Sequence, residues 1–241
     1  MTTVYAQPDI IAAGDLHLVK AKVTDISGKP VAGAMTYVSV AASGFQLRTG
    51  ISDQDGNLQY IVPNLPEKGQ FVFQADNRRD SGLVFTVENK FVTPFGSEAT
   101  TESNYDIGDT THFYGAPDKA YLLDDYTRFA SLEEVFREFI TEVKISKQGS
   151  NFRLNVLNKP FRIYFENEPL VLLDGIPVFD HNKLLDIDPL KIKSIDVIAR
   201  KYYLGSLLCN GIVSLYSFDG DMAGYTLPFR ALVTEFNLQG R

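Results

Sequence analysis

Pairs of neighbouring carboxylates are the residues of this 241-residue sequence best suited to chemistry. They occur at Asp124–Asp125, at Glu133–Glu134, and at Asp186 with Asp188. Two carboxyl groups held roughly 5 to 9 Å apart can serve as acid and base in glycoside hydrolysis. Acidic residues also cap the first turn of a helix, where the helix dipole favours negative charge. We predict this structural role for the three pairs, and no catalysis.

Other residues with nucleophilic or metal-binding side chains are few. The single cysteine, Cys209, excludes an internal disulfide and a site built from several thiolates. Its apolar neighbours in LGSLLCNGIV predict a buried, unreactive thiol. His17, His112 and His181 are far apart in the sequence and lack metal-ligand spacing. We therefore predict no catalytic residue, no cofactor and no metal site.

The segment DQDGN at 53–57 has acidic side chains spaced somewhat like those of a calcium loop. The bidentate Glu that an EF-hand needs at the end of the loop is absent. Asp and Asn side chains also cap their own turns. We predict a turn between two strands here, and another at Ser27–Pro30.

Composition narrows the classes of function. A hydrophobic content of 44% with 22% charged residues predicts a folded chain with one or two cores. No apolar run is long enough for a transmembrane helix, so we expect no membrane-spanning segment. The net charge is −7 and the basic residues are scattered, which argues against nucleic acid as a partner.

Apolar and polar residues alternate between about Leu16 and Phe91, with turn-forming residues between the alternating stretches. Short strands without helical periodicity are typical of an immunoglobulin-like β-sandwich, and we assign residues 1–92 to this all-β domain. Residues 93–120 contain five acids and few aliphatic side chains, which predicts an acidic linker or long loop.

From Tyr121 onward the pattern is that of an α+β domain, which we assign to residues 121–241. Ser131 and Glu134 form a capping box at the start of an amphipathic helix that extends to Ile140. The run PLVLLDGIPV predicts a strand covered on both faces that ends in an Asp-Gly turn. Further on we expect a short helix at His181–Asp186, strands at Ser194–Ile198 and Gly211–Ser217, and a helical turn at Lys201–Leu208.

Aromatic residues make up 12% of the chain, as twelve Tyr and seventeen Phe without Trp. A tyrosine gives a large rigid contact with a polar tip, which suits a partner surface and a β-rich core alike. We expect most of them to lie in the core, with Tyr105 and Tyr114 of the linker exposed. The candidates for a partner surface in the second domain are Tyr121, Tyr126, Phe129, Tyr202, Tyr203 and Tyr225.

The order SLEEVFREF, VKI, LLDGIPV, IKSIDVI and NGIVSLY, from about Ala130 to Phe218, resembles the plug domain of TonB-dependent outer-membrane receptors. The Arg-Gly pair common before the LLDG element of transporter plugs is absent. The segments VTDISGKPVAGAMTYVSV and SDQDGNLQYIVP resemble carboxypeptidase-regulatory and macroglobulin-type domains, which have immunoglobulin-like folds. Such domains often precede plugs in envelope proteins of Gram-negative bacteria.

The resemblance implies a non-enzymatic module that acts in binding or transport at the cell envelope, in the periplasm or associated with the outer membrane. An outer-membrane barrel or another envelope protein is the implied partner, and a glycan or peptide the implied ligand. We expect the chain to be a fragment of a larger outer-membrane-associated protein. The first alternative is an accessory carbohydrate- or peptide-binding module of an envelope hydrolase, and the second is that the second domain is itself an enzyme.

Overall fold

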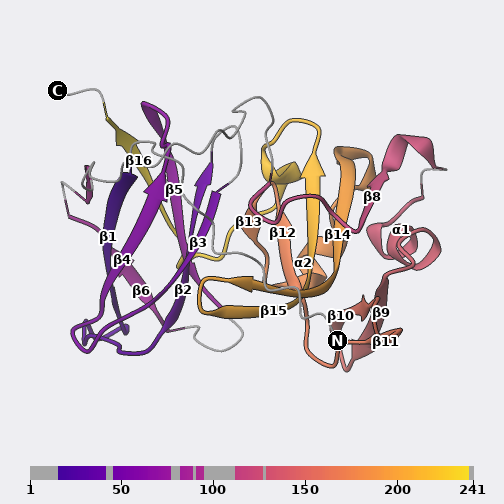
Figure 1. Ribbon diagram of the computed structural model, residues 1–241, viewed down its shortest axis with the longest axis horizontal. Helices are drawn as coiled ribbons and strands as arrows, with labels where there is room; N and C mark the ends of the chain where they lie inside the picture. Colours follow the sequence, from indigo (N-terminus) through magenta and orange to yellow (C-terminus); the bar gives the residue numbers. More distant parts are fainter. Residues whose placement is uncertain are drawn as a thin grey trace. The chain divides into compact units, whose positions relative to one another are not determined.

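The computed structural model describes residues 16–41, 46–76, 82–88, 91–94, 112–126 and 129–238. Strands account for 51% of the structure and helices for 11%, so the β-rich character expected from the sequence is confirmed. The chain divides into two compact units, which are described separately below (Figure 1). Unit 1 comprises Met1–His112 and Phe229–Arg241, and unit 2 comprises Phe113–Pro228.

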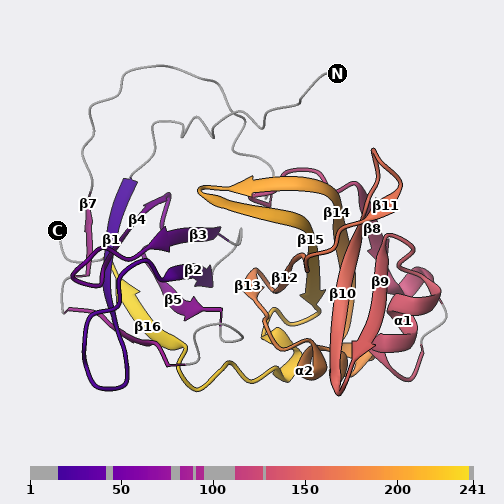
Figure 2. The same ribbon diagram turned by 90° about the horizontal axis from the view of Figure 1, so that it is seen from below.

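Unit 1 contains two antiparallel sheets that share one core (Figure 2). The first sheet has the order β4-β1-β6, and β7 also pairs with β1. The second sheet has the order β16-β5-β2-β3. The strands are β1 (Leu16–Thr24), β2 (Met35–Ala41), β3 (Gln46–Ile51), β4 (Asn57–Pro63), β5 (Lys68–Ala75), β6 (Val84–Thr86), β7 (Val92–Pro94) and β16 (Leu232–Asn237).

Side-chain alternation forms the core of unit 1. In β4, Leu58, Tyr60 and Val62 are buried, whereas the residues between them face solvent. This two-residue period turns one face of the strand toward the opposite sheet. Phenylalanines of β5 fill the centre, where the rings of Phe71 and Phe73 lie 5.9 Å apart.

The turn predicted at 53–57 is confirmed. Oδ1 of Asp53 accepts hydrogen bonds from the backbone N–H groups of Asp55 at 2.9 Å and Asn57 at 2.7 Å. Gly56 has a φ of 75°, and a Cβ atom there would lie 2.4 Å from the carbonyl oxygen of Val23. Because only glycine tolerates both constraints, this residue fixes the path from β3 into β4.

The strand β16 comes from the far end of the chain. It pairs antiparallel with β5, from Leu232 opposite Phe73 to Asn237 opposite Lys68. Phe236 is buried, and its ring centroid lies 4.5 Å from that of Phe71. This differs from the domain limits expected from the sequence, which placed residues up to 241 in the second domain. Alternation within a strand predicts one buried face but does not specify which sheet the strand joins.

Unit 2 contains a five-stranded sheet in the order β13-β12-β15-β14-β8 and a three-stranded sheet in the order β11-β10-β9. β12 and β15 are parallel, and the other pairs are antiparallel. The strands are β8 (Lys119–Leu122), β9 (Val143–Gln148), β10 (Asn151–Asn158), β11 (Ile163–Tyr164), β12 (Leu170–Leu173), β13 (Ile176–Pro177), β14 (Ile192–Leu204) and β15 (Leu207–Ser217). The helices are α1 (Leu132–Glu138) and α2 (His181–Leu185), with 3-10 turns η1 (Leu123–Asp125), η2 (Pro189–Lys191) and η3 (Met222–Gly224).

Local predictions for unit 2 are confirmed where the signal is strong. The Ser131 side chain accepts a hydrogen bond from the backbone N–H of Glu134 at 3.3 Å and begins α1. All four residues of β12 are buried, as expected of a continuous apolar strand. The short helix predicted at 181–186 is α2.

The helical turn predicted at Lys201–Leu208 was wrong. These residues form the end of the hairpin β14–β15, in which Leu204 pairs with Leu207 across Gly205 and Ser206. Gly205 has a φ of 58°. A two-residue loop that starts with a left-handed glycine matches the twist of a hairpin, so the turn chemistry overrides any local helical preference.

The segment 93–120, expected to be a linker, is described only at its two ends. Its first two residues belong to β7. Residues 95–111 lie outside the described residues, and residues 113–120 belong to unit 2. Asp118 attaches this segment to β14, because its carboxylate accepts a hydrogen bond from the backbone N–H of Ala199 at 2.8 Å and pairs with Arg200.

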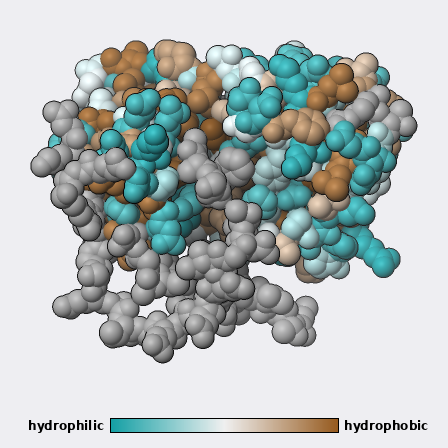
Figure 3. Space-filling view, turned by 90° about the horizontal axis from the view of Figure 1, so that it is seen from above, coloured by the Kyte–Doolittle hydropathy of each residue, from teal (hydrophilic) through white to brown (hydrophobic). Residues whose placement is uncertain are grey.

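In the part of the chain that the structure describes, no helix combines the length and apolar character needed to cross a membrane. Hydrophobic and hydrophilic residues are mixed on the face shown in Figure 3.

Candidate functional site

The three carboxylate pairs lie on separate helical elements. Asp124 and Asp125 lie in the first turn of η1. Glu133 forms an ion pair of 2.8 Å with Arg137 one turn further along α1. Asp186 ends α2, and Asp188 accepts a hydrogen bond from the backbone N–H of Leu190 at 2.9 Å. Glu133 and Asp188 therefore act in local helix structure, as predicted, whereas Asp186 lies at the C-terminal end of its helix and not in a first turn.

The remaining candidate residues for catalysis or metal binding are also separate. His17 and His181 are buried in different units, and Nδ1 of His181 lies 3.4 Å from Glu168 Oε1. Cys209 is buried, and burial raises the pKa of its thiol to about 12. Within the described ranges, no three His, Cys, Asp or Glu side chains gather in a way that could hold a metal ion.

Asp174, in the LLDG turn between β12 and β13, is a buried carboxylate that sequence reasoning treated only as a turn residue. It is 3% exposed. Its oxygens accept hydrogen bonds from the Ser217 backbone N–H at 2.8 Å, the Ser217 hydroxyl at 2.6 Å and the Met222 backbone N–H at 2.8 Å. These contacts attach the turn to the end of β15 and to η3.

Backbone strain concentrates around the same carboxylate. Asp174, Met222 and Ala223 have φ values of 47°, 60° and 51°, and they are three of the five described non-glycine residues with positive φ. Each such residue costs on the order of 1 kcal/mol or more. The three bonds to Asp174 offset this cost, so we interpret the carboxylate as a positioning group for the sheet end.

A second buried polar cluster joins residue 114 to the five-stranded sheet. The Tyr114 hydroxyl lies 3.1 Å from Asp196 Oδ2 and also hydrogen-bonds the Tyr216 hydroxyl. Burial raises the pKa of Tyr114, and it raises that of Tyr216 to about 12, so both stay protonated. The prediction that Tyr114 is exposed was wrong, because its hydroxyl finds polar partners inside the unit. Tyr105 lies outside the described residues.

The six aromatic candidates for a partner surface divide between core and surface. Tyr121 is buried, and its hydroxyl donates to Glu142. Tyr203 is 61% exposed near the end of the β14–β15 hairpin. The other four are half-buried: Tyr126, Phe129, Tyr202 and Tyr225.

A different group of apolar residues is exposed where β10 turns into β11. Phe161 is 72% exposed, Ile163 62% and Tyr164 42%, and we call these three residues the β11 patch. Lys159 and Arg162 are exposed in the same turn. Sequence reasoning missed the patch because Phe161 to Phe165 alternate like an ordinary strand. The turn residues Asn158, Lys159 and Pro160 were the available signal, since side chains beside a tight turn have few neighbours.

Comparison of the chain with protein-family models, with curated proteins and with solved structures found no match. The resemblances noted in the sequence therefore remain hypotheses.

Proposed function

We propose that this chain is a non-enzymatic binding module of the Gram-negative cell envelope, with an immunoglobulin-like sandwich in unit 1 and a plug-like α+β unit in unit 2. The module binds an envelope protein, such as an outer-membrane barrel, and belongs to a larger outer-membrane-associated protein. The β11 patch is the observation that carries this proposal.

The side chains in and beside the β11 patch are of types that contribute strongly to protein–protein binding. Aromatic residues and arginine are enriched in the energetically dominant parts of interfaces. Here Phe161 and Tyr164 lie on either side of Arg162 and Ile163. Exposing three large apolar side chains in water is unfavourable, and burial of each in a contact would contribute about 1.5 to 3 kcal/mol.

The backbone of the turn holds Phe161 outward at a cost. Arg162 has a φ of 55°, in the left-handed region that disfavours residues with a side chain. The turn is fixed because the backbone N–H groups of Phe161 and Arg162 both donate to the carbonyl oxygen of Asn158, at 3.0 and 2.8 Å. Strain retained on a surface turn supports a binding role for that turn.

Charge indicates the kind of partner. Lys159 and Arg162 are both exposed beside the patch, so a surface that offers an apolar pocket rimmed by Asp or Glu would complement it. We therefore expect an acidic surface segment of the envelope protein to contact this turn.

The order of elements in unit 2 supports the plug-like assignment. The segments that resemble a plug domain form, in chain order, the capped helix α1, the strand β12 with its Asp-Gly turn, and the hairpin β14–β15. β12 and β15 pair in parallel, which brings the LLDG and NGIVSLY segments side by side. The two antiparallel sheets of unit 1 are compatible with an immunoglobulin-like domain.

The test is capture of envelope proteins by the immobilised chain from detergent-solubilised envelopes of the source cell. We expect one protein to be retained by the wild type and by Leu190→Asp, which alters an exposed residue of η2 elsewhere in unit 2. Phe161→Asp should reduce its retention by roughly tenfold or more, the usual effect of losing an interface anchor. Equal retention by all three proteins would overturn the proposal.

A further inference from the structure

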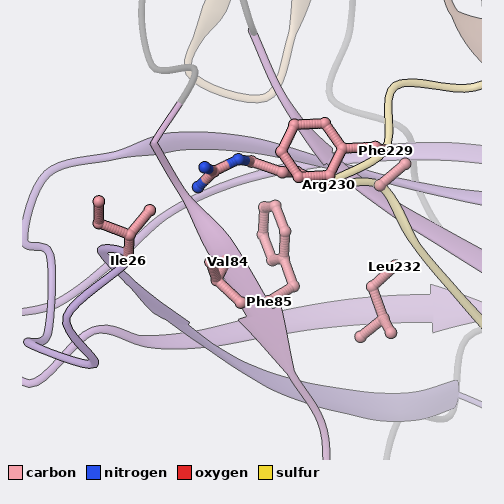
Figure 4. Close-up of a pocket in the computed structure, with 7 residues that line it drawn as sticks. Ile26, Val84, Phe85, Phe229, Arg230 and Leu232 are labelled. Atoms are coloured by element: carbon pink, nitrogen blue, oxygen red, sulfur yellow. The ribbon is translucent and has the colours of Figure 1, made fainter.

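A pocket of about 420 Å³ lies in unit 1 (Figure 4). Three separate segments line it: Ile26 in the loop after β1, Val84 and Phe85 of β6, and residues 229–232 leading into β16. Arg230 is the only charged residue among them, and the other six are apolar. The volume falls in the range typical of small-molecule sites.

Two nitrogens of the Arg230 guanidinium lack hydrogen-bond acceptors in this pocket. Its Nε and Nη1 atoms are buried, and neither has a hydrogen-bond partner in the described part of the chain. Arginine stays charged and offers five N–H donors, so buried donors without an acceptor are costly. The Phe229 ring lies 4.8 Å from Cζ of Arg230 and contributes a cation–π contact, but the ring supplies no oxygen acceptor.

The acidic residue next to Ile26 in the lining loop does not act as the acceptor for Arg230. Asp25 precedes Ile26, but its Oδ1 accepts hydrogen bonds from the backbone N–H and hydroxyl of Ser27 and from the backbone N–H of Lys29. These bonds keep the carboxylate within its own turn.

Two large apolar side chains of the lining are open to solvent. Ile26 is 74% exposed and Phe229 is 90% exposed. Figure 4 shows the Arg230 guanidinium turned toward the side of the pocket where Ile26 lies. A ligand with a hydrocarbon body would cover Ile26 and Phe229 while its polar end reached the guanidinium.

We propose that this pocket binds a small apolar monocarboxylate, such as a medium-chain fatty acid, with the carboxylate on Arg230. One positive charge in an apolar lining matches a monoanion better than a phosphate dianion, which needs more donors. The planar carboxylate also fits the guanidinium fork. The hydrocarbon packs on the apolar lining, including Ile26, Val84, Phe85 and Phe229. This site is independent of the β11 patch, which belongs to unit 2.

Titration calorimetry of the full chain with decanoate, below the concentration at which decanoate forms micelles, tests the proposal. We expect saturable binding of one decanoate per chain. Decan-1-ol lacks the charge and decyltrimethylammonium reverses it. The affinity for each should be lower than that for decanoate by roughly tenfold or more, because neither offers Arg230 a negatively charged acceptor.

Two variants and one control decide which residues are responsible. Arg230→Met keeps the length and apolar stem and should lose roughly tenfold or more in decanoate affinity. Ile26→Asp, on an exposed side chain, should do the same by offering Arg230 an internal carboxylate. Lys144→Met, on an exposed residue of β9 in unit 2, removes one positive charge elsewhere and should bind decanoate like the wild type. The β11 patch takes no part in this assay, so its outcome does not depend on the proposed function.

Circular dichroism establishes that each variant is folded. No saturable binding, equal affinity for decanoate and decan-1-ol, or unchanged affinity in both Arg230→Met and Ile26→Asp would overturn the proposal.

Discussion

Asp174 is the residue on which the end of the five-stranded sheet depends. Replacing it with alanine would leave the buried N–H groups of Ser217 and Met222 without their acceptor and would place alanine at a φ of 47°. We expect Asp174→Ala to destabilise unit 2 by about 3 kcal/mol or more, at 1 to 3 kcal/mol for each unsatisfied group. Hydrogen exchange of β12 and β15 peptides, read by mass spectrometry, measures this loss.

Two matched variants test whether the lost hydrogen bonds cause the destabilisation by Asp174→Ala. Asp174→Asn keeps an acceptor oxygen and tolerates the left-handed backbone, so its cost should be smaller, about 1 to 2 kcal/mol. Asp219→Ala removes an exposed acid nearby and should leave exchange unchanged. Equal exchange rates in Asp174→Ala and the wild type would show that the three hydrogen bonds do not stabilise the unit.

The ionisation of Asp53 makes the stability of unit 1 depend on pH. Hydrogen bonds from Asn57 and Asp55 lower the pKa of Asp53 below its ordinary value. The stabilisation is therefore fully present above the ordinary Asp pKa and is lost as the pH falls through the lowered value. Urea unfolding should show the wild type more stable than Asp53→Asn near pH 6, with the difference disappearing toward pH 2. A difference that persisted at low pH would contradict this explanation.

At the scale of elements, β16 is predicted to stabilise unit 1. Phe236 is buried against Phe71, and Phe-to-Ala changes in a core typically cost about 3 to 5 kcal/mol. Phe236→Ala should therefore accelerate hydrogen exchange in β2 and β5 but not in β12 or β15. Faster exchange in β12 and β15 instead would place the C-terminal strand with unit 2, as the sequence alone indicated.

Elements governed by local chemistry were predictable from the sequence, whereas their long-range partners were not. Ser131 and Glu134 specify the start of α1, and Asp53 with Gly56 specifies a turn, because the interacting atoms are a few residues apart. The pairing of β16 with β5 joins residues over 150 positions apart, and no local pattern contains it. The missing partners of Arg230 Nε and Nη1 were unpredictable for the same reason, since they depend on the whole fold.

At the scale of the whole molecule, the sequence of unit 2 is inserted between two parts of unit 1. Cleavage at a protease site engineered after Tyr105 should therefore leave the fragments 1–105 and 106–241 associated through β5 and β16. Size-exclusion chromatography should show one complex for the cut protein and two species when the cut chain carries Phe236→Asp. Separation of the cut wild-type fragments would contradict the pairing of these strands.

Photo-crosslinking in living source cells can detect binding of an envelope protein to the β11 patch. A photoreactive phenylalanine replaces Phe161 in the full protein, or Leu190 as the control position, and irradiated cells are fractionated. We predict one discrete adduct from position 161, recovered with the envelope and absent from position 190. Adducts of equal yield from both positions, or recovery of the position-161 adduct with the cytosol, would contradict the proposed function.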